Sequence, residues 1–205
     1  MRTLLLGAAA AFAVGAVVPA PAPQNPAGDE PPLRFRVAID GQEHELTENE
    51  AKALRVGERE HQVRIVVEPL RRFAAAGLQF EYPRGMNFEH ELGDNEQWTL
   101  EGPDVTFMIM RTPVAASVIA KGMLRIGKGE APSPCKVVLG GKEYDGFTRR
   151  FRMGSTAMET TLVPIERAGG GVVVSLQDVL DDDRRSTECT ALLALLAKTC
   201  VVATK

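Results

Sequence analysis

The cleanest alternation of apolar and polar residues lies between Phe73 and Arg111. Three segments, Leu78–Pro83, Met86–Leu92 and Gln97–Glu101, place apolar side chains at every second position, as half-buried strands do. A fourth, Val105–Met110, is apolar on both faces, which is typical of an interior strand. The spacing predicts an antiparallel meander whose aromatic side chains point inward and whose acids point outward.

After the meander, the pattern changes to a helical period. Thr112-Pro113 fits the N-cap and first position of a helix, and Gly127 fits its C-terminal end. The apolar side chains at helical spacing, which this prediction buries, are Val114, Val118, Ile119, Met123 and Ile126.

Two glycine turns then predict two antiparallel hairpins. Cys135–Leu139 and Lys142–Met153 flank Gly140-Gly141, and Ala157–Ile165 and Val172–Gln177 flank Gly169–Gly171. Ser186 is expected to cap a final helix, with Glu188 in its first turn. The apolar stripe of that helix would be Cys189, Leu192, Leu193, Leu196 and Cys200.

Residues 33–70 predict a small N-terminal β unit. Asp40-Gly41 is a strong hairpin signal between Leu33–Ile39 and Gln42–Leu46. His61–Glu68 is rich in β-branched residues and indicates a further strand. The intervening segment from Thr47 fits either a capping box that starts a short helix or a strand ending near Gly57, and the strand is the favoured interpretation.

The first 32 residues differ in composition from the rest. Arg2 is followed by an apolar run from Leu4 to Val18, then by small residues and prolines, in the order of a secretory signal peptide. The run is shorter than the roughly 20 residues that cross a bilayer, so a membrane anchor is the less favoured alternative. The sequence predicts a signal peptide (1–22), a proline-rich linker (23–32) and a secreted or periplasmic mature protein without a membrane span.

The segment with Phe73, Gly77-Leu78-Gln79-Phe80-Glu81-Tyr82-Pro83 and then Met86–Leu92 is similar to the opening strand pair of the PsbP/Mog1-like superfamily. The order of the remaining elements also agrees over roughly Arg72–Lys205. This resemblance implies an α+β fold for residues 71–205, an α/β/α sandwich around an antiparallel sheet. Members of that superfamily are mostly accessory or binding proteins, but the resemblance assigns no functional residue.

Composition supports a folded protein with no polyanionic partner. Of the 205 residues, 44% are hydrophobic and 25% are charged, which suffices to bury a core. The net charge of −3 comes from interspersed residues of both signs, so we expect no binding to nucleic acid.

Three cysteines leave at least one thiol outside any intramolecular disulfide. Cys189 and Cys200 lie eleven residues apart on the predicted helix. That spacing is about 16 Å, too long for a disulfide. Any bridge would therefore include Cys135, and three buried thiols is the alternative.

Candidate chemistry is sparse, and no catalytic, cofactor or metal residue is assigned. His44 and His61 could meet near a glutamate, but no HExxH or His-x-His spacing is present, so a solvated surface is favoured. His90 falls on an apolar strand face, which favours a hydrogen-bonded core or edge histidine. The sequence contains no G-x-S-x-G, GK[ST] or GxGxxG motif.

The candidate interaction patch consists of arginines. Clusters at Arg71, Arg72, Arg149, Arg150 and Arg152, together with Arg184-Arg185, could converge on an acidic partner. Charged sheet edges that resist aggregation show the same pattern, and that interpretation is favoured.

The leading hypothesis is an exported, non-enzymatic accessory module that binds another protein in the cell envelope. One alternative is a secreted enzyme using histidine and glutamate residues, which requires titratable groups to converge in a concave site. Another is a soluble carrier of an apolar ligand, which requires a cavity lined by Met86, Phe88, Trp98 and Met108.

Overall fold

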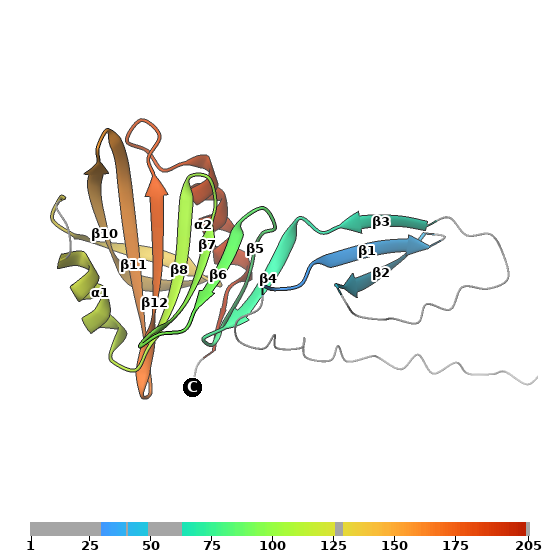
Figure 1. Cartoon of the computed structure of the whole chain (residues 1–205), viewed down its shortest axis with the longest axis horizontal. Coiled ribbons are helices and arrows are strands. Elements are labelled where there is room, and N and C mark those ends of the chain that lie inside the picture. The colour runs from blue at the N-terminus through green and yellow to red at the C-terminus, as the bar shows by residue number, and fades with distance from the viewer. Residues whose placement is uncertain (1–29, 40, 49–62, 126–128, 204–205) are drawn as a thin grey trace, which may run out of the picture.

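A computed structural model describes residues 30–39, 41–48, 63–125 and 129–203, which form antiparallel sheets and two helices (Figure 1). The α+β class is therefore confirmed. The predicted signal peptide, most of the linker, and His61 lie outside the described residues.

In chain order the elements are β1 (Arg34–Ile39), β2 (Gln42–Thr47), β3 (Val63–Val67), β4 (Leu70–Ala75), β5 (Leu78–Pro83), β6 (Asn87–Glu91), β7 (Glu96–Glu101), β8 (Val105–Thr112), α1 (Ala116–Arg125), β9 (Ser133–Leu139), β10 (Lys142–Met153), β11 (Thr156–Arg167), β12 (Gly170–Val179), α2 (Thr187–Thr199) and β13 (Val201–Val202).

The largest sheet has seven strands in the order β6-β7-β8-β12-β11-β10-β9. It contains the predicted meander β6-β7-β8 and both predicted hairpins, which turn at Gly140-Gly141 and at Gly169. Strand β8 lies between β7 and β12, as its two apolar faces predict.

Leu78–Pro83 is a strand, but the expectation that it belongs to the meander is wrong. This strand, β5, pairs with β4 and β13 in a separate three-stranded sheet. Phe73 of β4 stacks on Phe80 of β5 with ring centroids 4.8 Å apart, and Phe80 meets Phe107 of the large sheet edge-on at 5.4 Å. Aromatic packing thus joins the two sheets across the core.

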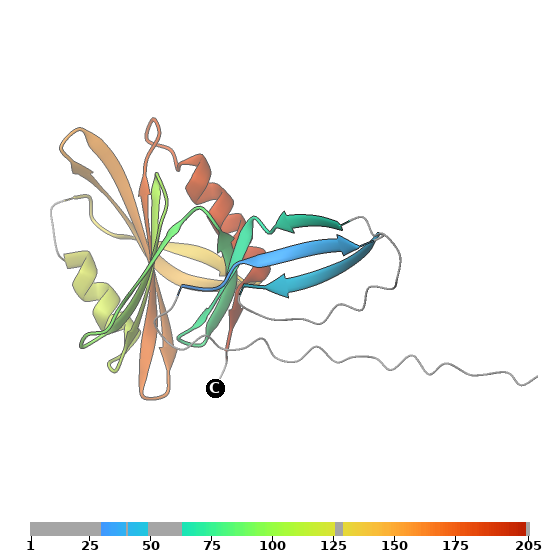
Figure 2. The same cartoon turned by 45° about the vertical axis from the view of Figure 1, so that its right-hand side comes forward.

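The two helices cover opposite faces of the seven-stranded sheet (Figure 2). Successive strand residues point to opposite faces, so β12 contributes Val172 and Val174 to the core that contains α2, and Val173 to the smaller cluster under α1. The larger core also contains Tyr82, Trp98 and Leu192, all at most 2% exposed.

Helix α1 begins later than predicted, and only part of the predicted stripe packs on the sheet. Thr112 is the last residue of β8 rather than the N-cap. The Glu166 carboxylate of β11 instead accepts hydrogen bonds from the backbone N–H groups of Ala116 (3.0 Å) and Ser117 (2.8 Å). The residues that the helix buries are Ala116, Ala120 and Leu124. Ile119 and Met123 of the predicted stripe pack against this cluster, whereas Val114 and Val118 are 46% and 62% exposed.

Close approach of α1 to the sheet explains this choice of face. A Cβ on Gly171 of β12 would lie 2.6 Å from the Cβ of Ala116, so a larger residue at either position would push the helix away. Small side chains are therefore the ones that fit.

Helix α2 begins as predicted at Ser186. The Ser186 hydroxyl accepts from the Cys189 N–H (3.0 Å) and donates to Asp178 of β12 (2.6 Å), whose carboxylate also accepts from the Ser186 N–H (3.1 Å). Glu188 in the first turn accepts from the N–H groups of Asp104 (2.8 Å) and Val105 (3.2 Å). The helix is thereby tied to two strands of the sheet.

Strands β1, β2 and β3 form an N-terminal antiparallel sheet in the order β2-β1-β3. It projects away from the seven-stranded sheet beyond β4 (Figure 1). The Arg34 guanidinium of β1 donates to the Glu81 carboxylate of β5 at 2.8 Å and links this sheet to the rest. No helix in the described part of the chain is long and apolar enough to span a membrane.

All three cysteines are free thiols. Cys189 and Cys200 are buried, and Cys135 is partly buried. They correspond to the alternative in which the cysteines serve as small core residues.

Candidate interaction surfaces

The five predicted patch arginines lie on two different sheets. Arg71 and Arg72 are on β4, where Arg71 pairs with Glu30 and donates to the Pro31 carbonyl at 3.1 Å, and Arg72 lies 3.6 Å from Glu81. The other three arginines are on β10 of the seven-stranded sheet. The sheets are joined through the core rather than through these side chains.

Arg150 forms an ion pair with a buried glutamate of the same sheet. Its Nε donates to the carboxylate of Glu159 (3.0 Å), which also accepts from Arg185 Nε at 2.9 Å, and the side chain of Glu159 is 7% exposed. A buried carboxylate requires such partners, so this cluster is part of the structure that holds β10, β11 and the entry to α2. Arg149 and Arg152 are different, because both line a groove described below.

The histidines are separated. His44 lies on β2, and His90 lies on β6 of the large sheet. As predicted, His90 is hydrogen-bonded at the core margin: its Nε2 lies 3.2 Å from Glu96 Oε1, and its ring stacks on Trp98 at 5.2 Å. Glu96 in turn pairs with Arg111. Among the described residues, no group of three histidine, cysteine, aspartate or glutamate side chains is arranged to hold a metal ion.

The cavity required by the apolar-carrier hypothesis is not formed by its four residues. Met86 and Trp98 are buried in the larger core, and Phe88 packs against it. Met108 follows the buried Phe107 on β8 and therefore points to the opposite face of the sheet.

The face to which Met108 points is only partly covered. Strand register places side chains of this face in rows across the sheet. One row runs Met108–Ser175–Leu162–Phe147, the next Thr106–Gln177–Thr160–Arg149, and a third Val179–Met158–Phe151. Helix α1 packs on Leu162 and Phe147 of the first row and on Val173 and Met110 beyond it. The apolar contacts of the helix therefore end before the second and third rows, where Arg149 alone is described as bonded to α1.

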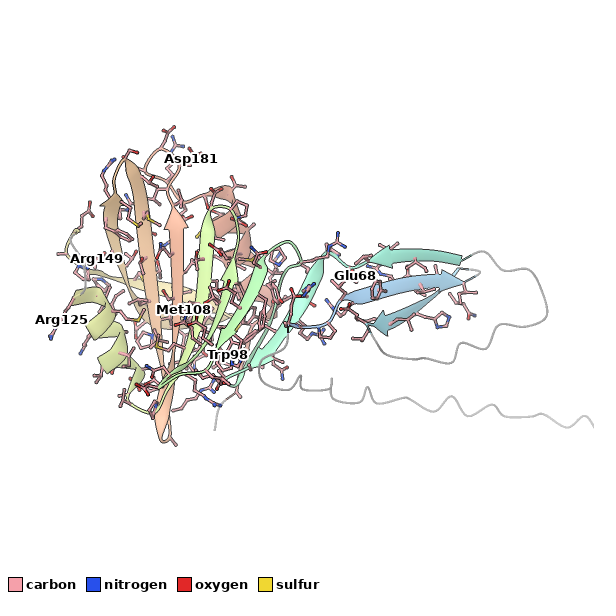
Figure 3. The ribbon with its side chains drawn as sticks, viewed as in Figure 1. Glu68, Trp98, Met108, Arg125, Arg149 and Asp181 are labelled. Atoms are coloured by element: carbon pink, nitrogen blue, oxygen red, sulfur yellow. The ribbon has the colours of Figure 1, made fainter. Side chains whose placement is uncertain are left out.

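A groove of about 480 Å³ results between α1 and the sheet. This volume lies within the range of small-molecule sites. Figure 3 shows Met108 near the middle of the sheet and Arg149 toward α1. The described residues that line the groove are Met108, Met123, Leu124, Arg149, Phe151, Arg152, Met153, Thr160, Leu162, Ser175 and Gln177.

The groove has a charged end and an apolar body. Arg149 Nη1 donates to the carbonyl of Leu124 at the end of α1 (2.7 Å), which fixes this guanidinium beside the groove. The side chain of Arg152 is 64% exposed, and its nearest acidic partner, Asp183, is 3.8 Å away. No carboxylate is among the lining residues that the structure describes.

The second surface is the outer edge of β3. This strand pairs with β1 alone among the described strands. Its consecutive residues Ile65, Val66 and Val67 are 66%, 38% and 36% exposed, so the strand presents apolar side chains on both faces. The opposite edge, β2, has exposed Glu43 and Glu45, which are charges of the kind that block edge pairing.

Sequence reasoning missed most of both surfaces. For the groove, the alternation along β8, β10 and β12 assigns each residue to a face, but it does not give the register between strands. For β3, the β-branched run predicted a strand without showing which neighbours it lacks.

Comparison with known proteins finds remote similarity among solved structures. No family model matches the chain, and no curated protein matches it significantly. Among solved structures, the chain is similar to the Ran-binding protein Mog1p of Saccharomyces cerevisiae at a TM-score of 0.45 and 9% sequence identity. The similar region covers 65% of this chain and 95% of Mog1p. The resemblance expected from the sequence is confirmed as a remote one, and Ran binding is a property of that protein.

Proposed function

We propose that this chain is an exported, non-enzymatic accessory module that binds another protein by strand addition at β3. The supporting observation is that, among the described strands, β3 lies at a sheet edge, with three consecutive apolar residues exposed. Natural sheets normally protect such edges with charges, bulges or proline. An edge with three consecutive exposed apolar residues is suited to accept an extended segment.

The partner would be an extended segment rich in β-branched or aromatic residues. Its backbone would pair with the outer edge of β3, while its side chains would contact Ile65 and Val67 on one face and Val66 on the other. Because β3 pairs with β1 in the register Val67–Phe35 and Ile65–Val37, an added strand would extend an apolar surface that already exists.

Export is part of the same proposal. It depends on the signal-peptide pattern of residues 1–22, and it places the interaction in the cell envelope or periplasm. We also propose that α1, the seven-stranded sheet and α2 constitute the PsbP/Mog1-like α/β/α sandwich. Residues 33–70 would then be an appended β unit whose role is to present β3.

Site-specific crosslinking in the native envelope fraction tests the proposal. A photoreactive amino acid replaces Ile65 in the full-length protein, and a matched protein has it at Leu92, which is 78% exposed in the loop after β6. We expect one discrete adduct with another protein from position 65 and none from position 92. Adding Val67→Lys, a charge of the kind that blocks strand pairing, should abolish that adduct.

Three results would contradict the proposal. They are equal crosslinking from both positions, no adduct from position 65, and an adduct with the mass of two copies of the chain. Circular dichroism and urea denaturation of Val67→Lys show whether the variant is folded, because a loss of crosslinking is informative only in a folded protein.

A further inference from the structure

We propose that the groove between α1 and the seven-stranded sheet binds a small amphipathic anion. The ligand has an apolar aromatic or alkyl body and one carboxylate, sulfonate or similar head group. This inference is independent of strand addition at β3, because the groove lies on the large sheet and β3 belongs to the N-terminal sheet.

The apolar half of the groove comes from three strands and the helix. Met108 of β8, Phe151 and Met153 of β10, and Met123 of α1 face it together. Methionine side chains are flexible and polarisable, so they adapt to apolar bodies of different shape. Leu162 forms part of the floor and is only 1% exposed.

Charge selects the sign of the ligand. Arg149 gives this groove a guanidinium group on the same face as Phe151, and Arg152 borders it from the opposite face of β10, while none of its described lining residues is acidic. The Arg152 side chain is 64% exposed, and its contacts to Asp183 (3.8 Å) and to the Ser155 carbonyl (3.4 Å) are long. The pairing of β10 with β9 ends at Thr148, so the Arg152 side chain can turn around the outer edge of β10 toward a bound head group. Guanidinium groups form charge-assisted hydrogen bonds with oxyanions.

Neutral polar groups complete the site. Thr160 and Gln177 are cross-strand neighbours in the row that ends at Arg149, and Ser175 lies in the adjacent row. They provide hydroxyl and amide donors between the apolar half and the arginines. A long apolar ligand without a head group would leave these groups unpaired, so we expect a preference for an amphipathic molecule.

Two fluorescent probes test the inference on the full chain. 8-Anilinonaphthalene-1-sulfonate has an aromatic body with a sulfonate, and N-phenyl-1-naphthylamine has the same body without it. We expect saturable binding of the sulfonate at one site, with tighter affinity than for the neutral probe and weakening at high salt. Arg152→Gln should weaken binding of the sulfonate by about fivefold or more, and should change that of the neutral probe by less than about twofold.

Matched variants locate the site. Met153→Glu places a carboxylate on a side chain that is 64% exposed, so folding should be retained while sulfonate binding is lost. Arg84→Gln removes a positive charge from an exposed turn outside the groove and should leave affinity unchanged. Ile65→Lys on β3 should also have no effect, which excludes probe binding to the exposed strand.

Competition distinguishes the two kinds of ligand body. Displacement of the bound sulfonate by dodecanoate would indicate an alkyl body, and displacement by 2-naphthoate would indicate an aromatic one. Either result supports the inference. The inference would be overturned if the sulfonate probe showed no saturable binding, or if its affinity did not depend on Arg152 and Met153. It would also be overturned if neither dodecanoate nor 2-naphthoate displaced the bound probe.

Discussion

The cap of helix α2 allows a prediction whose magnitude can be worked from the structure. Ser186→Ala removes a hydroxyl that accepts from the Cys189 N–H and donates to the Asp178 carboxylate. Both Ser186 (3% exposed) and Asp178 (2%) are buried, so water cannot replace either hydrogen bond. The variant therefore loses a helix cap and leaves a buried carboxylate with one fewer donor.

The expected destabilisation is the sum of two terms. Loss of a serine N-cap costs about 1 kcal/mol. Loss of a hydrogen bond to a charged acceptor costs about 1.5–3 kcal/mol. Because the two share one hydroxyl, we expect a combined loss of roughly 2–4 kcal/mol in the free energy of unfolding.

Urea denaturation followed by far-ultraviolet circular dichroism measures the change. With a slope near 2 kcal/mol per molar urea, the midpoint should fall by about 1–2 M without a change in slope. Ser186→Thr keeps a hydroxyl and should retain most of the stability. Thr187→Ala, the exposed neighbour, should change stability by less than about 0.5 kcal/mol. A loss below about 1 kcal/mol for Ser186→Ala, or equal losses for alanine and threonine, would refute the reasoning.

Three other expectations concern the core, the thiols and the first helix. Phe80→Ala and Tyr82→Ala should each cost about 3–5 kcal/mol in urea denaturation, since both side chains are buried, and a cost under about 1 kcal/mol would defeat their core assignment. Burial, with the Asp178 carboxylate nearby, raises the pKa of Cys189 to about 12, and burial raises the pKa of Cys200 to about 11. Both thiols should therefore react with Ellman's reagent at pH 8 only after unfolding, and rapid labelling of the native protein would contradict this. Hydrogen bonds from Ser117 and Ala116 lower the pKa of Glu166 below its usual 4.5. The stability difference between the wild type and Glu166→Gln should therefore be present at neutral pH and fade as the pH falls through the lowered pKa. A difference that is constant with pH would exclude the carboxylate cap.

The sequence predicted elements whose signals are local. The hairpins at Gly140-Gly141 and Gly169 combine a turn with apolar runs on either side, and the Ser186 cap is set by its own helix. Strand β4 was missed because Leu70–Ala75 has no alternation, and its pairing with β5 is determined by Phe73 packing on Phe80. The second partner of β5 could not be predicted either, since β13 lies more than one hundred residues further along the chain.

Helix α1 shows how tertiary contacts override a local signal. Thr112-Pro113 has the chemistry of a helix start, but the cap comes from Glu166 on a different strand. Valines at helical spacing suggested the buried face of the helix. The helix instead approaches Gly171 so closely that only a small side chain such as that of Ala116 fits between them. The groove also depends on tertiary contacts, because the register between strands determines which residues of separate strands line it together.

The pairing of β13 with β5 also has a consequence for the order in which the chain matures. Val201 and Val202 complete the sheet that contains Phe80 and Tyr82, and α2 supplies Leu192 and Leu196 to the same core. A ribosome that has synthesised residues 70–180 has therefore made most strands of the protein but not the layer that closes them. We expect the nascent chain to expose its largest aromatic cluster until the final segment emerges, so that the core closes at the end of synthesis or after it.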